Sequence, residues 1–312
     1  MLLIHDCSNS DERPQNRGFG GSVENACVAL LKKHAHRFNC EFTTRDKAQV
    51  FFTNDVFPQS VVLSGKPLVK RMDGIFWQRG LQSRNICYNE SAQLAHYVVF
   101  VSKYSQSNYY QFGSTCKDCV ALNWVDTDIF YPHVEIEIPK FPHKWLAVAT
   151  SWSRAEKRPN EINSFAKMLP QGSTLTLVGN DGFSGPNILK VGYLQPEELA
   201  NLMRHCDALV NFSYRDASPK VVAEAISCGI PVLYANSGGT PELALYGVGV
   251  PDPQQSSIED KIPELLNIKS GLIEFYDMYA TLRLEAFKSV MPDLMQNNML
   301  TRYFNAFRSF NF

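Results

Sequence analysis

"RDASPKVVAEAISCGIPVLYANSGGTPEL" occupies residues 215–243 and follows the apolar run "DALVNFS". The pattern predicts a strand, a loop that holds Asp216, a helix, and a further strand at "IPVLYA". Ser218 suits the N-cap of the helix, Pro219 its first position, and Gly229 its exit. We therefore expect the helix to begin just after Asp216, where its free N–H groups favour an anion.

Glu224 lies eight residues after Asp216, in the middle of the predicted helix and among apolar neighbours. A buried carboxylate needs hydrogen-bond donors that offset its lost hydration. No arginine is adjacent in the sequence, so a hydroxyl-rich ligand such as a ribose would fit. Two alternatives stay open: a basic partner from elsewhere in the chain, or a side chain that points to water.

The composition is that of a globular protein. The chain has 312 residues, which favours two domains, with 45% hydrophobic residues and 20% charged residues. A net charge of −1 gives no sign of a nucleic-acid partner. The apolar run at the start is too short for a signal peptide or a membrane span, so a cytoplasmic protein is expected. The eight cysteines are expected to be reduced, and Cys116 with Cys119 lacks the second pair of a metal site, so we expect a loop there.

Short apolar runs alternate with helical patterns along the chain. In the first half the predicted strands are "LLIHDC", "AQVFFTND", "KPLV" and "AHYVVFV", and in the second half "KWLAVATS", "TLTLVG", "ILKVGY", "DALVNFS" and "IPVLYA". This alternation is typical of α/β proteins with parallel sheets. We predict two Rossmann-like domains whose sheets face each other across a cleft. Their expected extents are 1–138 and 139–290, with a linker around 134–143 and a terminal helix at 291–312 that packs back toward the first domain.

An ordered set of motifs resembles the retaining glycosyltransferases of family 4, which have the GT-B fold. The two acids of the quoted stretch, the following "EAISCGIPV" and the later "GGTPE" are similar to that family's signature. "LNWVDTDIFYP" at 122–132 resembles its interdomain segment, and "LVGN" and "VGYLQPEEL" resemble its nucleotide-binding segments. This chain departs from the pattern at Asp216, where Glu is usual, and at Trp124, where Gly is usual.

The resemblance implies roles for the residues that match. Glu224 would accept hydrogen bonds from the ribose of a nucleotide-sugar, and Asp216 would hold hydroxyls of the sugar. The other expected substrate-binding residues of this half are Ser218, Pro219, Lys220, Gly179 and Tyr193.

A further expected cluster lies in the loop after "KWLAVATS", where the family supplies an arginine and a lysine to the leaving diphosphate. Lys157 aligns with the lysine, Trp152 occupies the place of the arginine, and Arg154 is expected to substitute for it. Fixed positive charge would then stabilise the leaving group, and no acidic metal-binding cluster stands out in the sequence. The alternative is a solvated turn.

Three features of the first half are also candidates. The turn "NRGFGGS" resembles the family's glycine loop, so Gly20 and Gly21 are expected to contact the donor diphosphate or the acceptor. Asp73 stands where relatives often carry a functional His and is a candidate for positioning the acceptor, although an Asp-Gly turn is equally ordinary. The basic end of a predicted helix at 30–37 is favoured as a solvated face over a membrane-docking surface.

We predict a metal-independent glycosyltransferase that moves a sugar from a UDP- or GDP-linked donor to an acceptor hydroxyl on a glycan or small molecule, with retention of configuration and without a cofactor. Two alternatives remain: a nucleotide-sugar epimerase, which needs no acceptor, and a non-catalytic protein that binds a nucleotide or glycan. A dehydrogenase is disfavoured because no G-x-G-x-x-G fingerprint follows a strand.

Overall fold

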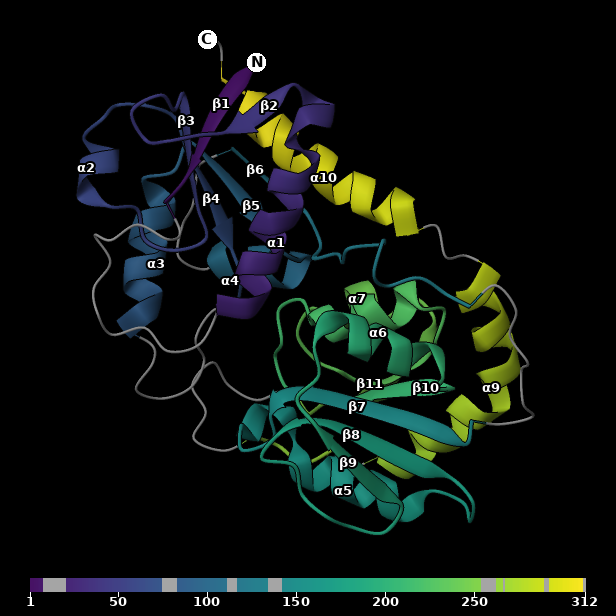
Figure 1. The fold of residues 1–312 in the computed structure, drawn as a ribbon. Coiled ribbons are helices and arrows are strands. Elements are labelled where there is room, and N and C mark those ends of the chain that lie inside the picture. Colours follow the sequence, from purple (N-terminus) through teal and green to yellow (C-terminus); the bar gives the residue numbers. More distant parts are fainter. Residues whose placement is uncertain are drawn as a thin grey trace. The chain divides into compact units, whose positions relative to one another are not determined.

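The computed structural model describes residues 1–7, 21–74, 83–110, 117–133, 142–253, 262–265, 267–288 and 292–310. The chain divides into two compact units, Met1–Val125 with Leu294–Phe312, and Asp126–Asp293. Within the described ranges each unit has one six-stranded sheet in which all neighbouring strands are parallel (Figure 1). The prediction of two Rossmann-like domains is confirmed. The predicted boundary at 138/139 falls outside the described residues.

The first unit has the strand order β2-β1-β3-β4-β5-β6, which is the flavodoxin-like order extended by one strand. Its strands are β1 (Leu2–Asp6), β2 (Cys40–Phe42), β3 (Val50–Thr53), β4 (Leu68–Met72), β5 (Tyr97–Phe100) and β6 (Lys117–Val120). Its helices are α1 (Gly21–His34), α2 (Gln59–Val62), α3 (Ser83–Gln93), α4 (Lys103–Tyr110) and α10 (Pro292–Arg308), with a 3-10 turn η2 (Ala35–Phe38).

The C-terminal helix α10 belongs to the first unit and packs through aromatic side chains. Phe304 stacks on Phe38 with ring centroids 4.4 Å apart, and Tyr303 meets Phe52 of β3 edge-on at 6.0 Å. Phe307 contacts the same Phe52 ring at 5.5 Å. Because α10 buries its aromatic face on strands from the start of the chain, the two ends of the sequence share one core.

The second unit has the strand order β12-β11-β10-β7-β8-β9, which is the Rossmann order. Its strands are β7 (Lys144–Ser151), β8 (Thr174–Asn180), β9 (Ile188–Gly192), β10 (Ala208–Asn211), β11 (Val232–Asn236) and β12 (Gly247–Pro251). Its helices are α5 (Pro159–Met168), α6 (Pro196–Arg204), α7 (Lys220–Ser227), α8 (Thr240–Leu243) and α9 (Ile268–Lys288), with a 3-10 turn η3 (Ala155–Lys157).

Trp145 of β7 is the centre of the second core. Its indole meets Phe165 of α5 at 4.9 Å and Phe275 of α9 at 5.0 Å, so these two helices cover the same face of the sheet. Helices α6 and α7 cover the opposite face (Figure 1). With both faces covered, the central strands are buried throughout, which explains their continuous apolar sequences.

The sequence analysis missed β2, β6, β12, α2, α3, α5, α8 and α9, and it was wrong about the segment that ends at Cys119. Cys116 lies outside the described residues, but residues from Lys117 to Val120 form the edge strand β6 and not a loop. Edge strands are only partly buried, so "KDCV" lacks the apolar run that marks an interior strand. Among the described helices, none is both long enough and apolar enough to cross a membrane.

Candidate functional site

The candidate site lies at the carboxyl ends of β7 and β10, which are neighbours in the second sheet. The strand order reverses between these two strands, and ligands of open α/β sheets bind outside the carboxyl ends of the strands at such a switch point. The loop after β7 contains Lys157, and the loop after β10 contains Asp216. Two residues that are 59 positions apart therefore meet at the place where the fold favours a ligand.

Lys157 and Asp216 form an ion pair at this point. The Lys157 Nζ atom lies 3.0 Å from Asp216 Oδ2 and donates a second hydrogen bond to Ser213 Oγ at 3.2 Å. The other carboxylate oxygen of Asp216 accepts a hydrogen bond from the Ser218 backbone N–H at 3.3 Å. Both charged side chains keep contact with solvent, at 16% and 27% exposure, so a ligand can reach them.

The loop that carries Asp216 is fixed by its backbone. The Arg215 N–H donates to Ser237 Oγ at 2.9 Å, and the Gly239 N–H donates to the Asp216 carbonyl at 2.8 Å. Gly238 has a φ of +62°, and a Cβ atom there would overlap the Asp216 carbonyl oxygen. Gly238, the first glycine of "GGTPE", is therefore required by the close approach of two backbones beside Asp216.

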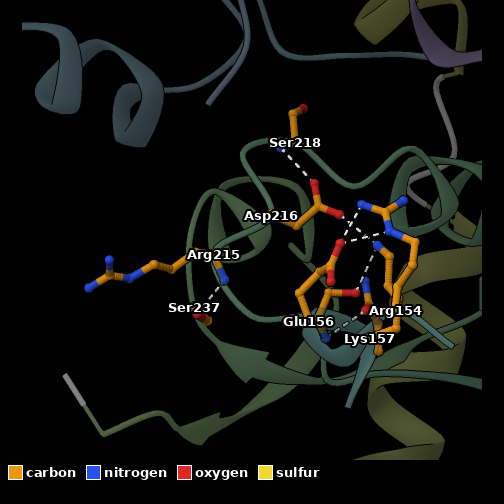
Figure 2. A network of polar contacts seen from close by, with 9 residues as sticks. Arg154, Glu156, Lys157, Arg215, Asp216, Ser218 and Ser237 are labelled. Carbon is orange, nitrogen blue, oxygen red and sulfur yellow. Dashed lines mark hydrogen bonds and ion pairs between the residues drawn. The ribbon is translucent and has the colours of Figure 1, made fainter. Parts of the chain in front are cut away.

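Arg154 is paired within its own loop. Its guanidinium lies 2.5 Å from Glu156 Oε1, and its side chain is 38% exposed. Figure 2 shows Arg154, Glu156 and Lys157 gathered beside Asp216, whereas the Arg215 side chain extends away from this group. Arg154 is thus close to the expected position, but with a carboxylate partner that the sequence analysis did not foresee.

Glu224 lies on α7 with its side chain 8% exposed, and it forms an ion pair with Lys220 at 3.1 Å. Burial raises the pKa of the Glu224 carboxyl above its usual value, and the neighbouring Lys220 opposes this shift. The expectation of a buried acid is confirmed. The sequence analysis considered only an adjacent arginine as a partner, whereas Lys220, one helical turn earlier, supplies the cation.

The start of α7 differs by one residue from the prediction. The helix begins at Lys220, and Pro219 rather than Ser218 is the N-cap, with no side-chain cap bond. Pro219 has no N–H to leave unpaired, so it takes this place at no cost. Gly229 follows the helix with a φ of +72°, as expected for its exit.

Trp152 and Gly179 are packing residues of the second core. Trp152 is buried, donates from Nε1 to the Val178 carbonyl at 3.0 Å, and meets the Phe183 ring edge-on at 5.9 Å. Gly179 has a φ of +126°, and a Cβ there would overlap the Ala149 carbonyl oxygen. The close approach of β7 and β8 accounts for this glycine without a ligand.

The remaining predicted residues do not all belong to one unit. Tyr193 follows the edge strand β9 and is exposed. Asp73 lies in the first unit at the end of β4, where its carboxylate is 2.8 Å from the buried Arg71 guanidinium. Gly21 is the first residue of α1, and Gly20 lies outside the described residues. Across the described part of the chain, no group of three His, Cys, Asp or Glu side chains is arranged to hold a metal ion.

Sequence reasoning missed three contributors to the site. Glu156 and Ser213 contact Arg154 and Lys157, and Ser237 holds the Asp216 loop from beyond β11. Glu156 carried a readable signal, because an acid between two basic residues of one short loop is placed to pair with one of them. The two serines carried none, since their role depends on how separate loops meet.

The comparisons with known proteins agree with this geometry. Two Rossmann-like units in this topology match the GT-B fold. Anabaena HepE in complex with UDP and glucose has a TM-score of 0.68 at 18% identity, covering 99% of this chain and 100% of that chain. Sucrose-phosphate synthase from Thermosynechococcus elongatus has a TM-score of 0.66 at 15% identity, covering 96% and 83%. A glycosyltransferase from Rickettsia africae has a TM-score of 0.62 at 14% identity, covering 95% and 83%.

The model of the family Glycosyl transferases group 1 matches residues 184–280, the segment that contains both Asp216 and Glu224. No curated protein matches the chain significantly. The matched segment and the shared fold together support a glycosyltransferase.

Proposed function

We propose that this chain is a retaining glycosyltransferase of the family 4 type, which moves a sugar from a nucleotide-sugar to an acceptor hydroxyl. The observation that carries the proposal is the Lys157–Asp216 ion pair at the switch point of the second sheet. It combines a cation for a phosphate and an acceptor for sugar hydroxyls within 3.0 Å, just ahead of the first turn of α7.

Donor binding replaces this ion pair with two ligand contacts. The diphosphate takes Lys157, and backbone N–H groups at the start of α7 add partial positive charge. Asp216, released from Lys157, accepts hydrogen bonds from the sugar. The side chain of Asp is one methylene shorter than that of Glu, and its 3.0 Å contact with Lys157 supports this role for Asp216.

Glu224 is proposed to hold the ribose. A carboxylate that is buried on a helix and has a raised pKa is costly to keep, which supports a role in binding. Two ribose hydroxyls would donate to its oxygens and share the carboxylate with Lys220.

The proposed reaction is same-face substitution within a short-lived ion pair. The bond between the sugar C1 and the phosphate oxygen breaks, and its electron pair passes to the diphosphate. The acceptor oxygen bonds to C1 on that same face, and its proton passes to the departing phosphate oxygen. Lys157 stabilises the negative charge that develops on the diphosphate, so we propose that the transfer is metal-independent.

A uridine donor is proposed on the strength of the HepE structures, which contain UDP, UDP with glucose, or UDP-glucose. Asp73 is proposed to position the acceptor hydroxyl, because the Arg71 guanidinium holds its carboxylate at the end of β4. The acceptor is a glycan or a small molecule, and no cofactor beyond the donor is proposed.

The test begins with thermal shift of the wild-type protein against UDP, GDP and their sugar conjugates. A bound nucleotide at 100 times its dissociation constant stabilises by about 2.7 kcal/mol. Turnover is then measured as nucleotide release with a panel of sugar acceptors. Lys157→Ala and Glu224→Ala are each expected to lower turnover by about 100-fold or more at unchanged far-UV circular dichroism. Wild-type turnover in the Lys157 variant would refute the proposal.

A second candidate is a non-catalytic protein that binds a nucleotide or glycan. The buried Trp152 favours it, because it removes one of the two cations that the family pattern provides. Tight UDP binding without turnover on any acceptor would establish this alternative. Conversion of the donor without acceptor, followed by NMR, would instead indicate an epimerase.

A further inference from the structure

Arg158 is the residue next to Lys157, yet the two side chains have different surroundings. Lys157 faces Ser213 and Asp216, whereas Arg158 is 1% exposed. Its backbone has a φ of +51° and a ψ of 57°, the left-handed conformation that glycine adopts most easily. In the glycosyltransferase pattern that this loop resembles, a glycine follows the lysine. The chain therefore carries an arginine where the backbone itself favours glycine.

The Arg158 guanidinium joins three segments of the second unit. It donates from NH1 to the Phe212 carbonyl at 3.3 Å, and from NH2 to Asp252 Oδ1 at 2.6 Å and to the Pro263 carbonyl at 2.8 Å. Phe212 begins the loop that leads to Asp216, and Asp252 follows β12. A planar guanidinium has the fixed fork of donors that such a three-way contact needs.

The Arg158 side chain makes two further contacts, one of them with the loop between β10 and Asp216. The Arg158 guanidinium lies 4.9 Å from the centre of the Tyr214 ring, and Glu161 of α5 is 3.7 Å from its Nε atom. The Tyr214 N–H donates to the Glu156 carbonyl at 2.8 Å. The loop before Asp216 is thus held on one side by Arg158 and on the other by the loop that carries Lys157.

We infer that Arg158 is a positioning residue: it fixes the loop between β10 and Asp216 so that Asp216 and Lys157 stand at the distance the donor requires. The inference rests on the proposed function. Arg158 touches no substrate, and its effect on the reaction passes through Lys157 and Asp216. In this role the left-handed backbone and the buried guanidinium of Arg158 together align the solvent-accessible side chains of Lys157 and Asp216.

The test is a double-mutant cycle between Arg158 and Lys157, with UDP affinity by calorimetry and UDP release from UDP-glucose as readouts. Arg158→Gly removes the guanidinium and relieves the backbone. It is expected to lower turnover about tenfold or more in the wild-type background, and to cause at most a twofold further loss in the Lys157→Ala background. Arg158→Lys keeps the charge but not the fork of donors, and is expected to recover only part of the lost turnover. UDP affinity should show the same coupling, which keeps the cycle readable where turnover of the double variant is too slow to measure.

The matched control is Arg283→Lys. Arg283 is also a buried arginine of the second unit, and it donates to the Gly229 carbonyl at 2.8 Å. This control should lower the melting temperature without changing turnover measured well below it. Equal losses from Arg158→Gly in both backgrounds, or no loss at all, would overturn the inference while Lys157→Ala still supports the proposed function. Full activity of Lys157→Ala, or no binding of UDP or GDP to the wild-type protein, would overturn the proposed function and with it the inference.

Discussion

The candidate site has an open side and a buried side, and residues of the two sides alternate in the loop after β7. The open side consists of Arg154, Glu156, Lys157 and Asp216. The buried side consists of Trp152, Arg158 and Gly179, and the half-buried Gly238 lies where the two sides meet. The open residues form ion pairs that a ligand can exchange, since their side chains keep contact with water. The buried residues make contacts that no ligand can replace.

The departures from the glycosyltransferase pattern in the Lys157 loop fall on the buried side. Trp152 stands in the place of an arginine, and Arg158 in the place of a glycine. Lys157 and Asp216, on the open side, form an ion pair with each other. In this loop the buried residues therefore differ from the pattern while the lysine matches it.

Trp152→Arg would break this division most severely. Restoring the family's arginine puts an unpaired cation among Phe183 and the Val178 carbonyl, and removes a buried indole. We expect the free energy of unfolding to fall by about 3–5 kcal/mol, with no gain in turnover. Urea denaturation measures the loss, and Trp152→Phe, which removes the Nε1 hydrogen bond and little volume, is the control at about 1–2 kcal/mol. Higher turnover with unchanged stability would mean that the packing around Trp152 is not rigid.

Gly238→Ala tests the contact between Gly238 and the Asp216 loop, where the two sides meet. A methyl group there overlaps the Asp216 carbonyl oxygen in addition to straining a φ of +62°. We expect a loss of about 2–3 kcal/mol in the free energy of unfolding and weaker UDP binding. Gly172→Ala is the matched control, because its φ is +86° and nothing lies within 4 Å of the added carbon. That variant should lose only about 1 kcal/mol and keep its UDP affinity. Equal behaviour of the two alanine variants would argue against contact between the glycine and the Asp216 loop.

Much of the second unit was predictable from its sequence, for a physical reason. Interior parallel strands are buried on both faces, so "IPVLYA" is a continuous apolar run. The meeting of Lys157 and Asp216 was also predictable in outline, since both follow strands of one Rossmann-like sheet. The inward direction of the Arg158 side chain was not predictable, because it goes with a left-handed backbone that no residue pattern marks. Edge strands such as β6 and β12 were missed because they lack that apolar signature.

Glu224→Gln gives the smallest expected effect. It tests a residue that is buried and is also proposed to bind ribose. Burial raises the pKa of its carboxyl in the folded protein, so ionisation destabilises the fold. This cost is absent below the ordinary pKa of 4.5, grows with pH up to the folded pKa, and stays constant above it. The glutamine variant should therefore match the wild type in stability near pH 4 and be more stable at higher pH, while its UDP affinity falls.

Melting temperatures across this pH range measure the Glu224 effect. Glu274→Gln, which changes an exposed carboxylate on α9, is the control and should show no such trend. A glutamine variant that loses stability as pH rises would mean that the Lys220 ion pair outweighs burial.

Three cations at the candidate site are each paired with a carboxylate: Arg154 with Glu156, Lys157 with Asp216, and Lys220 with Glu224. Paired charges of opposite sign cancel at a distance, so these three pairs add little electric field in the solvent beyond about 10 Å. A negatively charged nucleotide would therefore gain little attraction from them during its approach. It would be recognised only on touching the protein, when it takes a cation from its acid, and this favours selection by shape over selection by charge.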